Sequence, residues 1–255
     1  MNTETNNKYW EELAEDWDTR MGNDGNDFHR DLIRPATLRM LNTKSSERIL
    51  DVACGNGIFT RYLAERGIEV VAFDYSPAMI ENAKRRCADY SENIILSVAD
   101  ATNYEQLISL GGGKLFDKAV SNMAIMGIPD IKPLFKAVYE LLQNGGVSVF
   151  SAVHPCFETP KHDFTADGSG LITTQYIKPQ RVLQRILGDN SKCAEHWHRP
   201  LQEILSACFE AGFVLDGLEE PTFLQGQCTH SIWENVPLPL VMRVRKGCTY
   251  VRTVL

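Results

Sequence analysis

Short apolar runs alternate along the chain with longer segments in which apolar residues recur every three or four positions. The runs predict buried strands, and the segments with the longer period predict helices packed against them. The first run begins at Arg48 and breaks at Gly55. The other predicted strands span residues 69–74, 94–98, 116–121, 147–153, 213–218 and 240–245, and the predicted helices span 8–20, 27–41, 59–66, 76–88, 104–110, 131–142 and 200–211.

This alternation indicates an α/β fold in which helices cover both faces of a parallel sheet. No helix separates the run at 213–218 from the run at 240–245, so the last strand is expected to be antiparallel. We therefore predict a seven-stranded, mostly parallel, doubly wound sheet with an antiparallel last strand. Frequent Gly, Pro, Thr and His residues predict an insertion at 156–198, after the fifth strand, and a second irregular segment at 221–237.

The N-terminal segment, residues 1–45, is predicted to be helical. Pro35 predicts a kink or a break in its second helix. One face of the first helix carries the aromatic residues Tyr9, Trp10 and Trp17. This face either packs on the body of the protein or closes as a lid over a ligand. We expect a helical lid at 1–45 and one domain at 46–255.

Composition and charge narrow the functional classes. The net charge is −7 and the densest cationic run is Lys84-Arg85-Arg86, which disfavours a nucleic-acid substrate. No apolar run approaches 18 residues, and Met1–Lys8 is polar, so neither a membrane span nor a signal peptide is expected. The seven cysteines are scattered without a Cys-x-x-Cys pair. We therefore expect a cytoplasmic protein with reduced thiols and no metal site.

The turn at residues 53–57 contains Gly-Asn-Gly and follows the first strand, where backbone N–H groups can contact a ligand. A dinucleotide-binding turn would need a third glycine, but the chain has Thr60 at that position. A phosphate-binding P-loop is excluded because no Gly-Lys-Ser/Thr follows. The first three strands end at or near Asp51, Asp74 and Asp100. Sheets of this kind bind ligands at the carboxyl ends of their strands.

The run Asp-Val-Ala-Cys-Gly-Asn-Gly at 51–57, followed by these acids, resembles the class I S-adenosylmethionine-dependent methyltransferases. The resemblance covers residues 46–155, and the terminal helix–strand–strand portion matches more loosely. The family's usual first glycine is Ala53 here, and Cys54 occupies a variable position. The general layout is similar to the subgroup that contains quinone-biosynthesis and natural-product methyltransferases.

The resemblance implies a Rossmann-like fold that binds S-adenosyl-L-methionine and releases S-adenosyl-L-homocysteine. Asp51 would hold the methionine amino end, and the carboxylate of Asp74 would accept both ribose hydroxyls. Asp100 and the Ala101 amide would contact the adenine amino edge. The other implied cofactor contacts are the backbone of Ala53, Cys54, Gly55 and Gly57, the residues Tyr75, Ser76 and Met79 beside the adenine, Asn122 and Met123 beside the methyl group, and Tyr9 and Trp17 of the lid.

Methyl transfer needs an acceptor in line with the sulfonium and a group that removes the acceptor's proton. Histidine suits this role near neutral pH. His154, directly after the fifth strand, is the first candidate for the base, and His196 and His198 are next. His29 is expected on a helix surface. Two histidines at 196 and 198 without a third ligand do not predict a metal site.

No motif specifies the acceptor. Residues 121–124, Ser-Asn-Met-Ala, lack the Asn/Asp-Pro-Pro-Tyr of enzymes that methylate exocyclic base amines, and Pro155-Cys156 matches cytosine C5 methyltransferases only superficially. We expect transfer to an O, N or C atom of a small organic acceptor, by a monomer or homodimer. The alternatives are a methyltransferase that acts on nucleic acid or protein, and a non-catalytic S-adenosylmethionine-binding module.

Overall fold

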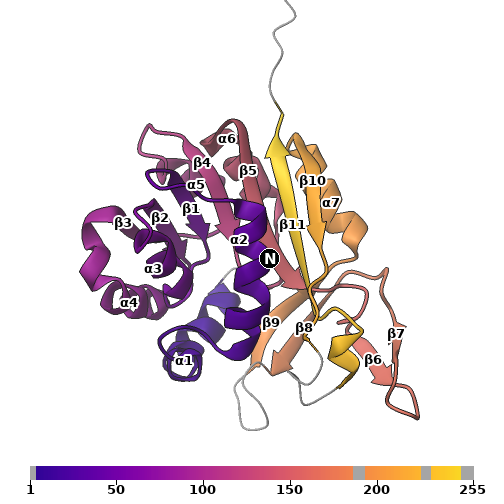
Figure 1. Cartoon of the computed structure of the whole chain (residues 1–255). Coiled ribbons are helices and arrows are strands. Elements are labelled where there is room, and N and C mark those ends of the chain that lie inside the picture. Colours follow the sequence, from indigo (N-terminus) through magenta and orange to yellow (C-terminus); the bar gives the residue numbers. More distant parts are fainter. Residues whose placement is uncertain (1–3, 186–192, 225–230, 248–255) are drawn as a thin grey trace, which may run out of the picture.

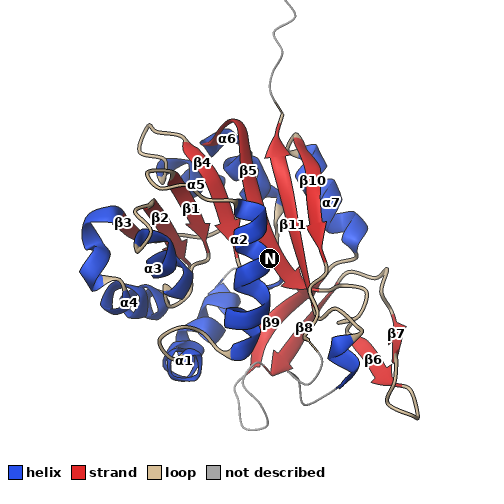
Figure 2. Cartoon of the chain, viewed as in Figure 1, coloured by secondary structure: helices blue, strands red, loops and turns tan. Residues whose placement is uncertain are grey.

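The computed structural model describes residues 4–185, 193–224 and 231–247. Parts of both predicted irregular segments, 186–192 and 225–230, lie outside these residues. The central feature is a seven-stranded sheet in the order β10-β11-β5-β4-β1-β2-β3 (Figures 1 and 2). Its strands are β1 (Arg48–Val52), β2 (Glu69–Asp74), β3 (Ile94–Val98), β4 (Phe116–Ser121), β5 (Leu142–Val153), β10 (Phe213–Glu219) and β11 (Pro239–Lys246).

The strand directions confirm the predicted fold class. Strand β1 pairs in parallel with β2 and β4, and β2–β3 and β4–β5 are also parallel. Strand β11 is antiparallel to both of its neighbours, β5 and β10. The parallel strands therefore all end at one edge of the sheet, and the order reverses between β1 and β4, where such sheets bind their ligands.

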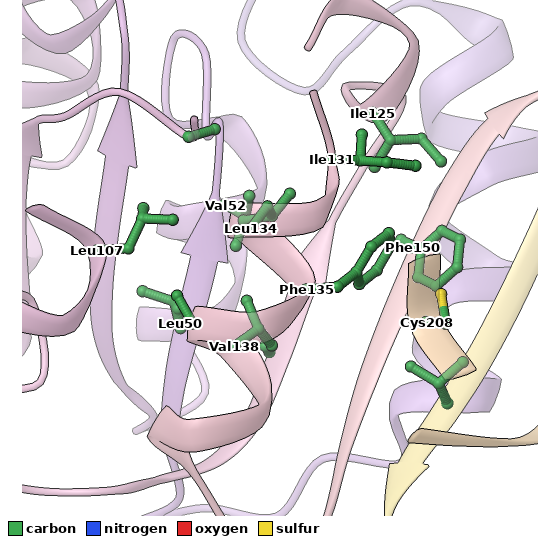
Figure 3. Packing of buried hydrophobic residues seen from close by; sticks show 14 of the residues in the cluster. Leu50, Val52, Leu107, Ile125, Ile131, Leu134, Phe135, Val138, Phe150 and Cys208 are labelled. Carbon is green, nitrogen blue, oxygen red and sulfur yellow. The ribbon is translucent and has the colours of Figure 1, made fainter. Parts of the chain in front are cut away.

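Helices cover both faces of the sheet because its strands are apolar on both sides. Alternate residues of β1 face opposite ways, so Leu50 and Val52 join one buried cluster and Ile49 joins the other. The first cluster includes Phe135 of α6 against Phe150 of β5, with ring centroids 5.1 Å apart (Figure 3). The helices are α3 (Ile58–Ala64), α4 (Pro77–Arg86), α5 (Tyr104–Ser109), α6 (Lys132–Leu141) and α7 (Leu201–Glu210), with 3₁₀ segments at Ala88–Asn93, Ile125–Gly127 and Ser231–Glu234.

The N-terminal segment forms α1 (Glu4–Met21), a π-helix (Phe28–Ile33) and α2 (Arg34–Leu41). The break predicted at Pro35 takes the form of this π-helix. Proline has no N–H to donate to the preceding turn, so regular α-helical bonding cannot pass through it. Figure 1 places α1 at the edge of the sheet to which the parallel strands point.

The predicted insertion after the fifth strand forms two β-hairpins. Strands β6 (Lys161–Phe164) and β7 (Leu171–Thr174) make a hairpin that projects from the body, and β8 (Gln180–Arg185) and β9 (Cys193–His198) make a second one near α1 (Figure 1). The predicted start of the fifth strand at residue 147 was wrong, because β5 begins at Leu142. Its first residue, Leu142, pairs with Phe116 of β4, and after a register irregularity the pairing resumes between Val147 and Lys118.

No helix within the described ranges is long and apolar enough to cross a membrane.

Candidate functional site

A cavity of about 510 Å³ lies at the carboxyl ends of the parallel strands. Its wall is built from the turn after β1, the ends of β2 and β3, the segment after β4, the π-helix with α1, and the β8–β9 hairpin. Thirteen of the residues predicted from the sequence line it: Trp17, Asp51, Ala53, Cys54, Gly55, Asp74, Tyr75, Met79, Asp100, Ala101, Asn122, Met123 and His196. Tyr9, Gly57, Ser76, His154 and His198 do not line it.

In the turn after β1, every second residue has a positive φ angle. Ala53, Gly55 and Gly57 have φ values of 52°, 55° and 79°. Gly55 has open space where a side chain would be, so its backbone faces the cavity freely. A Cβ on Gly57 would lie 2.8 Å from the Cβ of Ala83 on α4. Gly57 therefore allows α3 and α4 to pack closely. It does not line the cavity.

Asp51 is a buried carboxyl at the end of β1. Thr60 Oγ1 donates a hydrogen bond of 2.6 Å to its Oδ2. Burial raises the pKa of Asp51 to about 7, which the bond from Thr60 opposes. The residue that replaces the third glycine of a dinucleotide turn thus holds this carboxyl in place.

Asp74, at the end of β2, is fixed by backbone donors. The amides of Gly55 and Ser76 donate to its two oxygens at 2.9 and 3.0 Å. Burial raises the pKa of Asp74, and these amide bonds act in the opposite direction. Ser76 is the N-cap of α4, because its hydroxyl accepts from the amide of Met79 at 3.1 Å. Ser76 therefore supports Asp74 from outside the cavity.

The segment after β4 is held by side chains from distant parts of the chain. Thr37 Oγ1 of α2 donates to Asn122 Oδ1 at 2.8 Å. The amide of Met123 donates to the carbonyl and to the hydroxyl of Ser151, at 3.1 and 3.0 Å. At the end of β3, Asp100 Oδ1 accepts from the amide and the hydroxyl of Thr102, both at 2.7 Å.

Helix α1 covers the cavity and is bonded to the elements beneath it. Trp10 and Trp17 both line the cavity, edge to face, with ring centroids 5.7 Å apart. Glu11 Oε2 accepts from Ser76 Oγ at 2.6 Å and from the amide of Ala78 at 3.1 Å. Asp18 Oδ1 accepts from Asn56 Nδ2 at 2.8 Å, in the turn after β1. These contacts show that α1 packs on the body of the protein, and its action as a lid stays a prediction.

The three histidines proposed as bases differ in position. His154 is buried, with Nε2 2.8 Å from Glu220 Oε1 and Nδ1 accepting from the amide of Cys156 at 3.2 Å. His198 Nε2 donates to the carbonyl of Tyr176 at 2.7 Å. His196 alone of the three lines the cavity, and burial lowers its pKa to about 4.

His29 was placed wrongly on a helix surface by the sequence interpretation. Its ring lines the cavity beside Trp17, and burial lowers its pKa to about 4. The signal for it was weak: a histidine that follows a Gly/Asn/Asp-rich connection after an aromatic helix. Within the described ranges, no group of three or more His, Cys, Asp or Glu side chains could hold a metal ion.

Residues 49–146 match the protein family described as a methyltransferase domain. The chain is 36% identical over 111 residues to malonyl-[acyl-carrier protein] O-methyltransferase 1 of Ilyobacter polytropus, covering 43% of this chain and 39% of that protein. It is 27% identical over 186 residues to a ubiquinone biosynthesis O-methyltransferase of Coxiella burnetii, covering 68% and 75%. The chain spans less than half the length of the first curated relatives that it matches.

Solved structures share the fold. An S-adenosylmethionine-dependent methyltransferase from Mesorhizobium loti superimposes with a TM-score of 0.70 at 27% identity, over 88% of this chain and all of that one. The N-methyltransferase NodS from Bradyrhizobium japonicum, solved with S-adenosyl-L-homocysteine, gives 0.56 at 16% identity, over 91% and 97%. The latter likeness concerns the fold alone.

Proposed function

We propose that this chain, which contains a class I S-adenosylmethionine-dependent methyltransferase domain, transfers the methyl group of S-adenosylmethionine to an atom of a small organic acceptor. One observation carries the proposal: a single cavity joins the acids at the strand ends to the aromatic residues of α1 and to the β8–β9 hairpin. A cofactor on the strand ends would leave the remainder of that cavity for an acceptor.

The cofactor would lie along the turn after β1. Asp51 would face the methionine ammonium, and Asp74 would accept the ribose hydroxyls through lone pairs that its bonds to backbone amides leave available. Asp100 and Ala101 would border the adenine. In this arrangement residues 1–45 act as the lid of a domain at 46–255.

The sulfonium supplies an activated methyl group, so the protein's own contribution is position and exclusion of water. Trp10 and Trp17 would shield the reacting atoms, and the aromatic faces would favour the sulfonium cation. The names of the curated relatives include transfer to malonyl-[acyl-carrier protein], to phosphoethanolamine and in ubiquinone biosynthesis. The names with phosphoethanolamine and ubiquinone support N or O transfer to a small acceptor in this chain, whereas the malonyl group of the first name is carried on a protein.

Two competing functions make different predictions. A methyltransferase acting on nucleic acid or protein would need a surface for a polymer, which the net charge of −7 does not favour for nucleic acid. A binding module without turnover would bind S-adenosylmethionine and release it unchanged. We place the protein in the cytoplasm, as a monomer or homodimer.

The test is a methyl-transfer screen of the purified chain against a metabolite extract, with S-adenosylmethionine carrying a deuterated methyl group. The proposal predicts a labelled small molecule and an equal amount of S-adenosylhomocysteine. Label found only in polymer would support the first competitor. Cofactor binding without any labelled product would support the second.

A further inference from the structure

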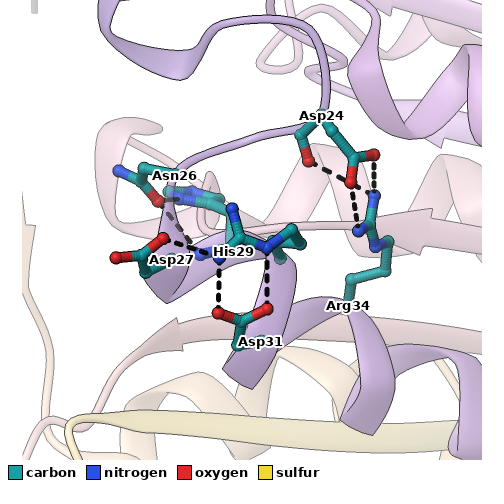
Figure 4. A network of polar contacts seen from close by, with 7 residues as sticks. Asp24, Asn26, Asp27, His29, Asp31 and Arg34 are labelled. Atoms are coloured by element: carbon teal, nitrogen blue, oxygen red, sulfur yellow. Dashed lines mark hydrogen bonds and ion pairs between the residues drawn. The ribbon is translucent and has the colours of Figure 1, made fainter. Parts of the chain in front are cut away.

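His29 has a fixed tautomer. Its ring Nδ1 lies 2.8 Å from Asn26 Oδ1, and its backbone N–H donates to the same oxygen at 3.0 Å (Figure 4). A backbone amide only donates, so the Asn26 atom that it contacts is an acceptor. Nδ1 must then carry the ring proton. The lone pair of the neutral imidazole is consequently on Nε2.

The ring is held in the cavity wall by aromatic neighbours. Its centroid lies 5.8 Å from that of Trp17 and 5.4 Å from that of Phe28, and both contacts are edge to face, at 86° and 82°. Trp10, Trp17, Phe28 and His29 all line the cavity. Because burial lowers its pKa to about 4, the imidazole is neutral at pH 7 and its Nε2 lone pair is available.

We propose that the methyl acceptor is the hydroxyl group of a small aromatic compound, stacked on this aromatic wall, and that His29 Nε2 takes the hydroxyl proton. This inference rests on the proposed function and names the acceptor class and the base of the same site.

The charges of the wall favour a neutral acceptor. The described lining residues include six carboxyl groups and three guanidinium groups: Asp24, Asp51, Asp74, Asp100, Glu158 and Glu195 against Arg20, Arg34 and Arg185. Two of these carboxyls are already in ion pairs, Asp24 with Arg34 at 2.6 Å and Glu195 with Arg181. The other lining carboxyls are Asp51, Asp74, Asp100 and Glu158, and the other lining guanidinium groups are those of Arg20 and Arg185. An anionic acceptor would therefore meet an excess of carboxyls. A protonated amine has no lone pair on nitrogen with which to accept a methyl group.

Among neutral acceptors, an aromatic hydroxyl fits best. A phenol has a pKa near 10, whereas the O–H of water has one near 15.7. A weak base therefore removes the proton of a phenol far more readily than that of an O–H group as weakly acidic as water. Aromatic rings also prefer the edge-to-face and offset contacts that Trp17 and Phe28 already make with His29.

The step balances without a further reactant. The hydroxyl oxygen forms a bond to the methyl carbon, the carbon–sulfur bond breaks, and its electron pair stays on sulfur as S-adenosylhomocysteine. The hydroxyl proton passes to His29 Nε2. The positive charge leaves the sulfonium as it appears on the imidazolium, so the net charge of the cavity does not change.

Three variants test the role of His29. His29→Asn keeps an N–H close to the position of Nδ1 but removes Nε2, and should lower kcat on the order of a hundredfold while the affinity for S-adenosylhomocysteine is unchanged. Asn26→Leu should lower kcat because nothing then keeps the ring proton of His29 on Nδ1. Asn26→Asp should have a higher kcat than Asn26→Leu, because its carboxylate still accepts from Nδ1. His162→Asn, on the projecting hairpin, is the matched control and should behave like the original chain.

The substrates are a panel of catechols and simple phenols, with anilines, aliphatic alcohols, thiols and carboxylic acids of similar size. Methylated phenols, lost in His29→Asn, support the inference. Full activity of His29→Asn, loss in His196→Asn instead, or methylation of another class alone would overturn it, as would cofactor binding with no product from the panel. Failure to bind S-adenosylmethionine at all would instead refute the proposed function.

A measurement without turnover tests the tautomer separately. Imidazole ¹⁵N shifts of the protein saturated with S-adenosylhomocysteine should show His29 protonated on Nδ1 and bare on Nε2 at pH 7. A proton on Nε2 would overturn the inference even if phenols were methylated.

Discussion

Thr60 donates a 2.6 Å hydrogen bond to Asp51, and both side chains are buried beneath the turn after β1. The contact links the first turn of α3 to the end of β1. A glycine at position 60 would supply no such donor, so the departure from the dinucleotide pattern has a structural consequence. Because position 60 is a threonine, its hydroxyl holds the carboxyl of Asp51 below the point where the cofactor ammonium would lie.

The titration of Asp51 makes the stability of the ligand-free protein depend on pH. Its pKa is about 7 in the fold and about 3.9 when unfolded, so the folded state binds the extra proton between these values. Stability from this group is therefore present at low pH and is lost as the pH rises to 7. Asp51→Asn should remove this loss, and stabilise the ligand-free protein by roughly 2–4 kcal/mol at pH 8.

Thermal unfolding of the two proteins from pH 4.5 to 8 checks this prediction. The curves should separate progressively toward pH 8. Parallel curves would mean that Asp51 titrates normally. The same substitution should weaken binding of S-adenosylmethionine, since the amide offers no charge to the ammonium.

Glu11 is predicted to slow release of the cofactor, because it bonds α1 to the start of α4 beside the cavity. Its carboxylate accepts from Ser76 Oγ and the Ala78 amide. Glu11→Ala should speed dissociation of S-adenosylhomocysteine about fivefold, the effect of about 1 kcal/mol of lost bonding. Glu15→Ala on the exposed side of α1 is the control. If Glu11→Ala and the original chain had equal dissociation rates in a stopped-flow displacement assay, α1 would not control release of the cofactor.

Arg199 should position the segment after β4. This buried guanidinium donates to the carbonyls of Ile125, at 3.2 Å, and Pro129, at 2.8 Å, and also to that of Ile128. Arg199→Met leaves these carbonyls without their donor and should cost about 3 kcal/mol of unfolding free energy. Arg199→Lys should recover part of it. Denaturant unfolding of both variants measures the difference, and an unaffected Arg199→Met protein would contradict the assignment.

His154 is expected to support the fold while leaving turnover unchanged. It follows β5 as predicted, but both ring nitrogens are engaged, with Glu220 and with the amide of Cys156. His154→Ala should therefore lower the melting temperature by several degrees, for a cost of about 1–3 kcal/mol. The kcat of the folded fraction should not change. A large fall in kcat at full folding would return His154 to the role of base.

Much of the fold follows from local pattern. The bounds of β2, β3 and β4 agree with the predicted runs, because each is an apolar stretch bounded by turn or charged residues. The start of β5 was missed since Gly145-Gly146 has the composition of a turn. Only the neighbouring strand β4 shows that the strand starts earlier, because Phe116 pairs with Leu142 before the register irregularity and pairing resumes at Val147.

The site divides in the same way. Asp51, Asp74 and Asp100 could be located because a strand end is visible in the sequence, and all three line the cavity. His29 could not, because its place in the cavity wall depends on contact with Trp17, which lies on a separate helix. A helix periodicity that stops at a proline also gives no sign of a π-helix, which changes the direction in which each side chain points.

The central claim is that S-adenosylmethionine binds across the turn after β1 and that the carboxylate of Asp74 accepts hydrogen bonds from its ribose hydroxyls. Isothermal titration of the chain and of Asp74→Ala with S-adenosylhomocysteine tests it most directly. The account predicts one site per chain, an affinity roughly 10- to 100-fold weaker in Asp74→Ala, and no binding of NAD by either protein. Binding of NAD in place of S-adenosylhomocysteine, or equal affinity of the two proteins for S-adenosylhomocysteine, would contradict it.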